Sequence, residues 1–284
     1  MSIKCILAPL SGGSGDRVVA QAAVMIAKRF GSEIQAIFPR DSASVSVGAL
    51  IGDERDEATE RFFDLLRESD EAAEDRVRET FQGILRDLNQ GGHDAPTALL
   101  DVTDDGPVQA VIERGGAHDL LIVALPDVAS IDQAKARDIA EAALFHTGRQ
   151  VLLVPKGISA GIGMKPMICW NKSPQAGRAV AQAMPFLEAA EAVSIFHVET
   201  GAKRGPSPGR LKHYLGLHQI TADIAQAPPD YRTVGEQILD EARKRGTDLL
   251  VMGAYSQSRL RERLLGGVTS YIFANSDVPV LMTR

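Results

Sequence analysis

The stretch DLLVMGAYSQSRLRERLLGGVTSYIFANSDVPVLMTR, Asp248 to Arg284, decides the fold of this chain. It begins with an apolar run, Leu249 to Met252, which has the length of a buried parallel strand, and Gly253 follows at the turn. A polar loop, the pair Gly266-Gly267 and an apolar helical segment lead to a second apolar run, Val278 to Met282. Glycines let the backbone approach a ligand closely, and free N–H groups at a helix start favour anions. The stretch therefore predicts a phosphate-holding turn between a strand and a helix.

The composition of the 284-residue chain narrows the classes of protein that it can form. A formal net charge of -6 argues against a nucleic-acid partner, because little on the surface would neutralise a phosphate backbone. The 44% hydrophobic content suits a globular core, and without an apolar run of about 18 residues we expect no membrane span. The start, MSIKCILAPLSGG, is typical of a strand rather than of a signal peptide. Cys5 and Cys169 fall in predicted buried strands without nearby metal-ligand partners, so we expect a reduced, cytoplasmic setting and no metal site.

The first half alternates strands and helices, which is typical of an α/β fold with a mainly parallel sheet. Its predicted strands are Ile3 to Leu10, Glu33 to Phe38, Thr97 to Val102, Leu120 to Leu125 and Gln150 to Val154. Its predicted helices are Asp16 to Phe30, a long charged helix or pair of helices from about Glu54 to Asn89, Pro107 to Arg114 and Ala134 to His146.

A glycine-rich linker, Lys156 to Lys165, precedes a second alternation of the same kind. Its predicted strands are Met167 to Trp170, Val193 to Val198, Ile220 to Ala225, Leu249 to Met252 and Val278 to Met282. Its predicted helices are Ser173 to Leu187, Arg210 to Gly216, Val234 to Arg245 and the apolar segment after Gly267.

The two halves can be overlaid, which indicates an internal repeat. DLLIVA at 119–124 matches DLLVMG at 248–253, and with the same offset Val151-Leu152-Leu153 falls on Val280-Leu281-Met282. Near the other end, Leu7 to Ser11 matches Met167 to Asn171, and the extra residues of the first half fall in its long charged helix. We therefore predict two tandem domains, residues 1–156 and 165–284.

The C-terminal stretch resembles the universal stress protein family. The family motif is a glycine, two residues, a glycine, nine residues, a glycine and a small hydroxyl residue, and Gly253, Ser256, Gly266 and Gly267 stand at its four marked positions. The spacing is kept, whereas serine replaces the second glycine and glycine replaces the hydroxyl residue. The start WNKS at 170–173 also looks like that of tandem bacterial members. The resemblance implies two doubly wound, five-stranded, Rossmann-like domains of the adenine nucleotide alpha hydrolase-like type, arranged as an internal pseudo-dimer through their last strands.

The resemblance further implies a role in stress response and an adenine-nucleotide site, with ATP as the ligand and Mg²⁺ as an accompanying ion. Family members that bind ATP usually carry an aspartate at the position of Asn171, so a metal role is weakened more than a ribose role. Open α/β sheets bind ligands at the carboxyl ends of their strands. The predicted nucleotide-binding residues at that edge are Trp170, Asn171, Val198, Gly253, Ser256, Gly266, Gly267, Val268 and Thr269.

Most of these residues also have a structural interpretation. Trp170 can be a packing residue rather than a stacking platform, and His197 is interpreted as structural rather than catalytic. The arginines of SRLRER at 258–263 serve either phosphate binding or a solvated face. The first half is predicted to have lost the site, because Ala124, Asp127, Arg137 and Asp138 stand at its motif positions. Its own glycine cluster, Ser11 to Gly15, is interpreted as a plain turn, with anion binding as the alternative.

The function that follows is a cytoplasmic stress-linked binding or regulatory protein with a nucleotide site in its second half. We find no arrangement of catalytic residues, so we expect no enzyme activity beyond slow, incidental ATP hydrolysis. Two alternatives stay open: a nucleotide-free protein-interaction module, and a pocket reassigned to another small ligand. Beyond the internal pseudo-dimer, a homodimer through the long first-half helix is a further hypothesis, the other being that this helix covers the inactive site.

Overall fold

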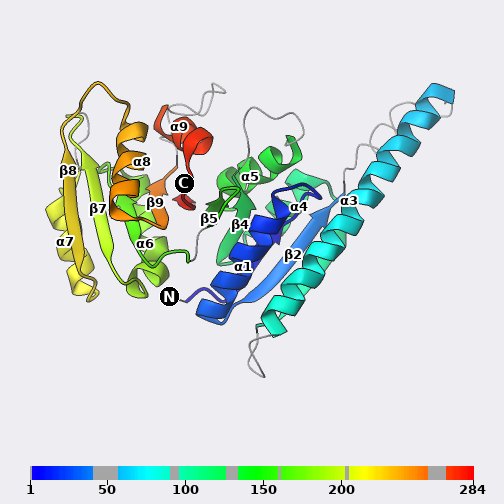
Figure 1. Ribbon diagram of the computed structural model, residues 1–284, viewed down its shortest axis with the longest axis horizontal. Helices are drawn as coiled ribbons and strands as arrows, with labels where there is room; N and C mark the ends of the chain where they lie inside the picture. Colours follow the sequence, from blue (N-terminus) through cyan, green and yellow to red (C-terminus); the bar gives the residue numbers. More distant parts are fainter. Residues whose placement is uncertain are drawn as a thin grey trace.

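A computed structural model of the chain describes residues 2–40, 57–89, 96–125, 134–158, 161–201, 205–254 and 267–284. Within these ranges, one ten-stranded sheet runs through the whole molecule (Figure 1), in the order β3-β2-β1-β4-β5-β10-β9-β6-β7-β8. Read outward from its centre, each half has the same order of strands. The strands are β1 (Cys5–Pro9), β2 (Glu33–Pro39), β3 (Ala98–Thr103), β4 (Leu120–Ala124), β5 (Gln150–Val154), β6 (Pro166–Cys169), β7 (Val193–Val198), β8 (Ala222–Ala227), β9 (Leu249–Gly253) and β10 (Val280–Thr283).

Helices cover both faces of the sheet, as in a doubly wound fold. One core face receives buried residues from α1, α3, α6 and α7, and the other receives them from α4, α5, α8 and α9. Both faces of the central strands are therefore buried, which explains their continuous apolar runs. The described helices are α1 (Asp16–Phe30), α3 (Glu57–Asn89), α4 (Pro107–Gly115), α5 (Ala134–His146), α6 (Pro174–Glu188), α7 (Pro208–Leu217), α8 (Val234–Arg245) and α9 (Gly267–Asn275).

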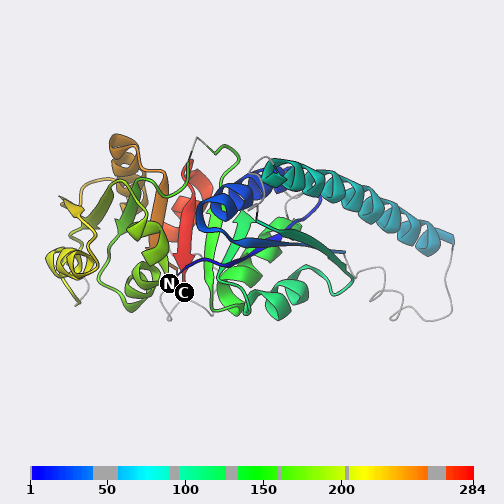
Figure 2. The same ribbon diagram turned by 90° about the horizontal axis from the view of Figure 1, so that it is seen from below.

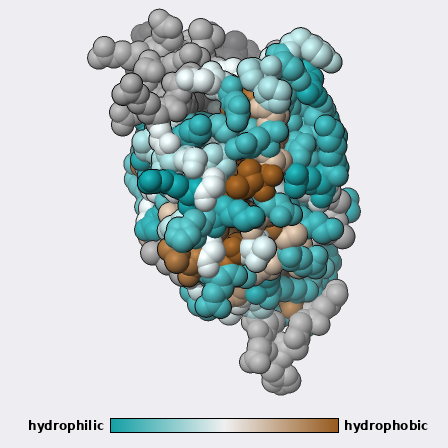
Figure 3. Space-filling model, turned by 90° about the vertical axis from the view of Figure 1, so that its left-hand side faces the viewer, coloured by the Kyte–Doolittle hydropathy of each residue, from teal (hydrophilic) through white to brown (hydrophobic). Residues whose placement is uncertain are grey.

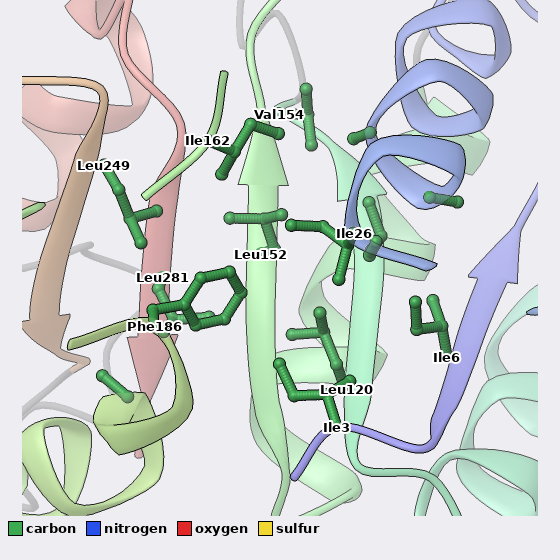
Figure 4. Packing of buried hydrophobic residues seen from close by; sticks show 14 of the residues in the cluster. Ile3, Ile6, Ile26, Leu120, Leu152, Val154, Ile162, Phe186, Leu249 and Leu281 are labelled. Carbon is green, nitrogen blue, oxygen red and sulfur yellow. The ribbon is translucent and has the colours of Figure 1, made fainter. Parts of the chain in front are cut away.

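The two halves join through β5 and β10, the one antiparallel pair among the described strands. Leu152 lies opposite Leu281, and these two residues are each other's equivalents in the sequence overlay. A pseudo-two-fold axis thus passes between them. Figure 4 shows that side chains from both sides of this seam, including Ile26 and Phe186, pack into one apolar cluster.

Equivalent carboxylates fix the start of the first strand in each half. Asp119 accepts hydrogen bonds from the backbone N–H groups of Lys4 and Cys5, at 2.8 and 3.2 Å. Asp248 does the same for Met164 and Lys165, at 2.8 Å each. The two aspartates occupy matching positions of the overlay, so the repeat extends from sequence to hydrogen bonding.

Arginines from both halves tie the halves together: Arg29 of the first, and Arg284 of the second, which donates to the carbonyl oxygen of Phe145 at 3.2 Å. The Arg29 guanidinium, at the end of α1, donates to the carbonyl oxygens of Ile162, Gly163 and Ala189 at 2.6 to 3.2 Å. Beside it, the rings of Phe30 and Phe186 meet edge to face with centroids 5.3 Å apart. These contacts add to the shared sheet, so the halves are packed on each other.

Helix α3 distinguishes the first half from the second. It is one helix rather than a pair, and its 33 residues make it about 50 Å long. Its later part packs on the body through Ala73, Val77, Phe81, Ile84 and Leu88, whereas its beginning projects past the sheet (Figure 2). It is strongly charged, and no described helix has the length and apolarity needed to cross a membrane.

The outer edge of the second half is polar. Strand β8 has mainly exposed or half-buried side chains, including Asp223 in an edge position. Figure 3 shows this end of the molecule, where the brown areas are small and separated by hydrophilic side chains. A charged, short edge strand resists pairing with another chain.

The fold class predicted from the sequence is confirmed, and the predicted starts of four elements need correction by two residues. Strand β1 begins at Cys5 instead of Ile3, because its pairing with β2 begins with Cys5 opposite Glu33. Strand β8 begins at Ala222 instead of Ile220, because the N–H group of Ile220 bonds to Leu215 at the end of α7. Strand β10 begins at Val280 instead of Val278, because Ser276 and Val278 form a turn through the Ser276 hydroxyl. Helix α7 begins at Pro208, two residues before the predicted start, because Ser207 caps it. The domain limits 1–156 and 165–284 stay a prediction.

Candidate functional site

A cavity of about 400 Å³ opens at the carboxyl ends of β6, β7 and β9, beside the first turns of α6 and α9. Small-molecule sites usually measure roughly 300–1,000 Å³ and lie at this edge of open α/β sheets. Every predicted site residue that the structure describes lines this cavity, whereas Ser256 and Gly266 lie outside the described residues. The predicted residues that the structure brings together are Trp170, Asn171, Val198, Gly253, Gly267, Val268 and Thr269.

Trp170 forms part of the cavity wall and is 5% exposed. Its indole N–H donates to the carbonyl oxygen of Pro206 at 2.9 Å, which anchors the segment before α7 over the cavity. Its ring belongs to the apolar cluster on the α6 and α7 face. The structural interpretation of Trp170 therefore holds, and its position on the wall adds contact with any bound ligand.

His197 on β7 is also buried, at 5% exposure. Its Nδ1 lies 2.7 Å from the carbonyl oxygen of Trp170, and because a carbonyl can only accept, Nδ1 carries the proton. This bond supports the structural interpretation of the residue. In the neutral ring, Nε2 is then an acceptor. It has no hydrogen-bond partner among the described residues, although His197 lines the cavity.

The turn between β6 and α6 presents Asn171, Lys172 and Ser173. Asn171 is exposed, and its Oδ1 accepts from the N–H group of Ser173 at 3.1 Å. The Ser173 hydroxyl caps α6 by accepting from the N–H group of Ala176 at 3.2 Å. Both oxygens stabilise the turn as acceptors, so this pair leaves two donor groups for a ligand, the amide NH₂ of Asn171 and the hydroxyl hydrogen of Ser173.

Gly253 ends β9 where α6 approaches most closely. A Cβ atom at this position would lie 2.6 Å from the backbone nitrogen of Ala176 and from the carbonyl carbon of Gln175. Close packing of a helix on a strand therefore requires glycine here, whether or not a phosphate binds.

The start of α9 brings backbone N–H groups to the same cavity. Gly267 is exposed, and a Cβ atom there would meet nothing within 4 Å. Val268 and Thr269 follow in the first helical turn, whose N–H groups have no acceptor within the helix. Such groups favour an anion.

The described residues do not make a site for Mg²⁺. Hard divalent cations prefer carboxylate oxygens, and the described lining of the cavity contains no Asp or Glu. Asn171 offers one amide oxygen that is already used, and the described chain holds no cluster of metal-ligating side chains.

Cys169 lines the same cavity, and burial raises the pKa of its thiol to about 12. The thiol stays protonated near neutral pH, so it contributes apolar surface rather than a nucleophile.

The first half has its own cavity, of about 510 Å³, at the carboxyl ends of β1, β4 and β5. The glycine cluster Ser11 to Gly15 lines it, but the loop already surrounds a carboxylate. Asp16, 5% exposed, accepts from the N–H groups of Ser11 and Gly12 at 2.9 and 2.7 Å, and from the Ser11 hydroxyl at 3.0 Å. Burial raises the pKa of Asp16, while these hydrogen bonds oppose the rise. The loop thus holds an anion of its own.

Helix α3 closes over this first-half loop. Arg76 donates to the carbonyl oxygen of Gly12 at 2.8 Å, and Ala73 lies against Gly12. Of the four altered motif positions, Ala124 lines the cavity, and Arg137 and Asp138 lie inside α5, which begins at Ala134. Asp127 lies outside the described residues.

Sequence reasoning missed several lining residues of the second-half cavity. Lys172 follows Asn171 directly, and extending the overlay by one residue would have set it against Gly12. Apolar wall residues from α8 had no distinguishing signal, because core and cavity positions share one helical pattern. The missed residues are Cys169, Lys172, Ser173, Gln175, Phe196, Thr200, Gly201, Val234, Ile238, Met252 and Ala254.

Fold and cavity together define a doubly wound α/β protein with a ligand cavity at the strand ends of its second half. Comparison with known proteins makes the class specific. Residues 230–284 match the model of the universal stress protein family. A universal stress protein of Methanocaldococcus jannaschii is 37% identical over 65 residues, which are 22% of this chain and 40% of that protein. The matched segment thus spans less than half of this curated relative.

Solved structures match the whole chain. A universal stress protein from Archaeoglobus fulgidus superimposes with a TM-score of 0.72 at 15% identity, covering 100% of this chain and 97% of that one. A candidate universal stress protein from Pseudomonas aeruginosa gives a TM-score of 0.56 at 14% identity, covering 99% and 93%. The match of residues 230–284 bears out the predicted resemblance to the universal stress protein family. The solved structures, at 14–15% identity, show the same fold over the whole chain, and their full-length coverage fits a tandem arrangement.

Proposed function

We propose that this protein binds an anionic adenine nucleotide in the cavity of its second half and acts as a cytoplasmic regulatory binding protein rather than as an enzyme. The supporting observation is the convergence of the predicted residues on one cavity. The wall residues Trp170 and Val198 and the first turn of α9 all line it.

The electrostatics of the cavity favour this ligand class. Lys172 is the one charged side chain among the described lining residues, and the N–H groups of the first turn of α9 add partial positive charge. Apolar wall residues such as Val234 and Ile238 suit a planar base, while hydroxyl and amide groups at the mouth suit a ribose and phosphates. The described lining residues include no carboxylate that would hold Mg²⁺, so we expect the nucleotide to bind in the presence of a chelator as well.

The test is calorimetric titration of ligand-stripped protein with ATP, ADP and AMP, with and without EDTA. Gly267→Asp is the informative variant, since its side chain has room and places a carboxylate at the start of α9. We expect it to weaken ATP binding by tenfold or more through charge repulsion. Its control is the neutral, similarly shaped Gly267→Asn, which should bind within about threefold of the wild type. The absence of heat at high micromolar nucleotide, with none carried through purification, would refute the proposal.

One observation favours the nucleotide-free interaction module as a second candidate. Gly253, the first glycine of the motif, is required by the packing of α6 alone. Its presence therefore gives no independent support to a phosphate. If the protein is such a module, Gly267→Asp leaves the cellular function unchanged. If the pocket instead binds another small ligand, mass spectrometry of the denatured protein identifies that ligand.

A further inference from the structure

Lys172 has an unusual backbone conformation. Its φ is 62°, and the only other described residue besides glycine with a positive φ is Gln219. A side chain bearing a Cβ atom is disfavoured in this left-handed region, which glycine occupies readily. Such outliers persist where the surroundings determine them, and they gather at functional sites.

The first half shows what the fold itself needs at this position. Gly12 is the equivalent of Lys172 in the overlay, and its φ is 79°. The turn after the first strand is therefore left-handed in both halves. The first half has the residue that this turn prefers, whereas the second half keeps a lysine there despite the strain.

The surroundings hold the Lys172 backbone in place. Gly205 lies so close that a Cβ atom on it would clash with the Lys172 carbonyl oxygen and lie 3.0 Å from its Cβ. The neighbouring Pro206 is fixed in turn by the Trp170 indole. The lysine is thus fixed at its base, and its half-buried side chain borders the cavity.

The charge of Lys172 is available to a ligand. It makes no ion pair with any residue that the structure describes, and no described carboxylate lines the cavity. Asn171 beside it is neutral and Ser173 is engaged as the helix cap. Among the described lining residues, Lys172 is therefore the one that brings a full positive charge.

We propose that Lys172 is the specificity-determining residue that makes this cavity select phosphate-bearing ligands over uncharged ones of the same shape. The inference rests on the proposed nucleotide function and adds the side chain that distinguishes a charged phosphate ligand from an uncharged one. The strained turn fixes the base of this lysine at the border of the cavity.

The test compares ATP, AMP and adenosine on the wild type, Lys172→Asn and Lys172→Arg. Asparagine tolerates the left-handed region and removes the charge, while arginine keeps it. We expect Lys172→Asn to lose about tenfold in ATP affinity, to lose less for AMP and to bind adenosine within about twofold of the wild type. Lys172→Arg should keep ATP within about threefold. Added salt should weaken ATP binding more in the wild type than in Lys172→Asn.

The outcomes separate the two proposals. If the wild type binds none of the three compounds, the proposed function fails, and this inference fails with it. If the wild type binds ATP but Lys172→Asn binds it equally well, only the inference on Lys172 is overturned. An equal loss for adenosine and ATP in a folded Lys172→Asn also overturns it, since Lys172 would then act through packing rather than charge.

Discussion

The two halves of this chain share a strand order and differ in the turn that follows the first strand of each. In the first half, Gly12 and the buried Asp16 fill the turn, and α3 lies over it. In the second half, Asn171 and Lys172 leave the corresponding turn open to a cavity, and Trp170 forms the wall. A repeated fold can thus keep its framework while one copy supplies its own carboxylate and the other, under the proposed function, takes an external anion.

The comparison also explains where glycine is found. At the closest approach of helix and strand, the second half has Gly253 on the strand and Gln175 on the helix. The first half has Ala124 on the strand and Gly15 before the helix, and a Cβ on Gly15 would lie 2.7 Å from the Ala124 Cβ. Each half therefore lacks one side chain at the same contact. In the second half it is missing from the strand, and in the first half from the residue before the helix.

The largest effect is expected from Gly12→Ala. The added Cβ would lie 2.5 Å from the Cβ of Ala73. The alanine would also have to adopt the φ of about 79° that Gly12 has. Left-handed strain and overpacking together should lower the free energy of unfolding by about 2–4 kcal/mol. Denaturant unfolding of the wild type and the variant measures this difference in the free energy of unfolding. Because Lys172 tolerates the same conformation, Lys172→Ala is the matched control and should change stability by less than about 1 kcal/mol; equal losses at both sites would contradict the described role of α3.

A smaller effect, about 1–3 kcal/mol, is expected from Gly253→Ala, because its Cβ would press on the backbone of α6. Gln175→Gly should not restore the loss, since the nearest atoms are the Ala176 nitrogen and the Gln175 carbonyl carbon. Thermal unfolding of the single and double variants measures this.

The control for Gly253 lies in the first half. Gly15→Ala should destabilise by a comparable amount, but Ala124→Gly should restore most of it, because that clash is between two Cβ atoms. Rescue in both halves, or in neither, would show that the two contacts are not the opposite choices that the structure indicates.

The smallest effect concerns the pH dependence of Asp16. Burial raises its folded pKa above the ordinary 3.8, so the native state binds this proton more readily than the unfolded chain does. Its contribution to stability is fully present below pH 3.8 and is lost as the pH rises through the folded pKa. The stability advantage of the wild type over Asp16→Asn should therefore narrow between pH 3 and pH 6. A widening advantage in urea titrations across this range would show that the hydrogen bonds outweigh burial.

Much of the fold was predictable because the apolar runs that form the strands recur at matching positions in the two halves. The offset that set Asp119 on Asp248 also predicted that Leu152 and Leu281 are equivalent, and they meet at the seam. Helices α1, α5 and α8 begin and end where their patterns predicted, since apolar periodicity and glycine stops mark them clearly. Edge strand β8 was misplaced by two residues because a polar edge strand has no apolar run.

The chemistry of the site was less predictable than its location. Gly253 matched the motif, but only coordinates show that α6 requires it. Asp16 was placed in a helix start, and its role as the anion of its own loop depends on three hydrogen bonds that sequence does not specify. The importance of Lys172 depends on a backbone angle, and a sequence does not show which residues are left-handed.

Trp170 offers the most direct test that the second-half cavity binds nucleotide. It is the only tryptophan in the chain, so the protein has a single indole N–H resonance, located in the cavity wall. Titration with ATP should shift this resonance along a one-site curve, with the same dissociation constant as calorimetry, and Gly267→Asp should greatly reduce the shift. An indole resonance that stays unchanged at saturating ATP would contradict the account, because the nucleotide would then bind elsewhere.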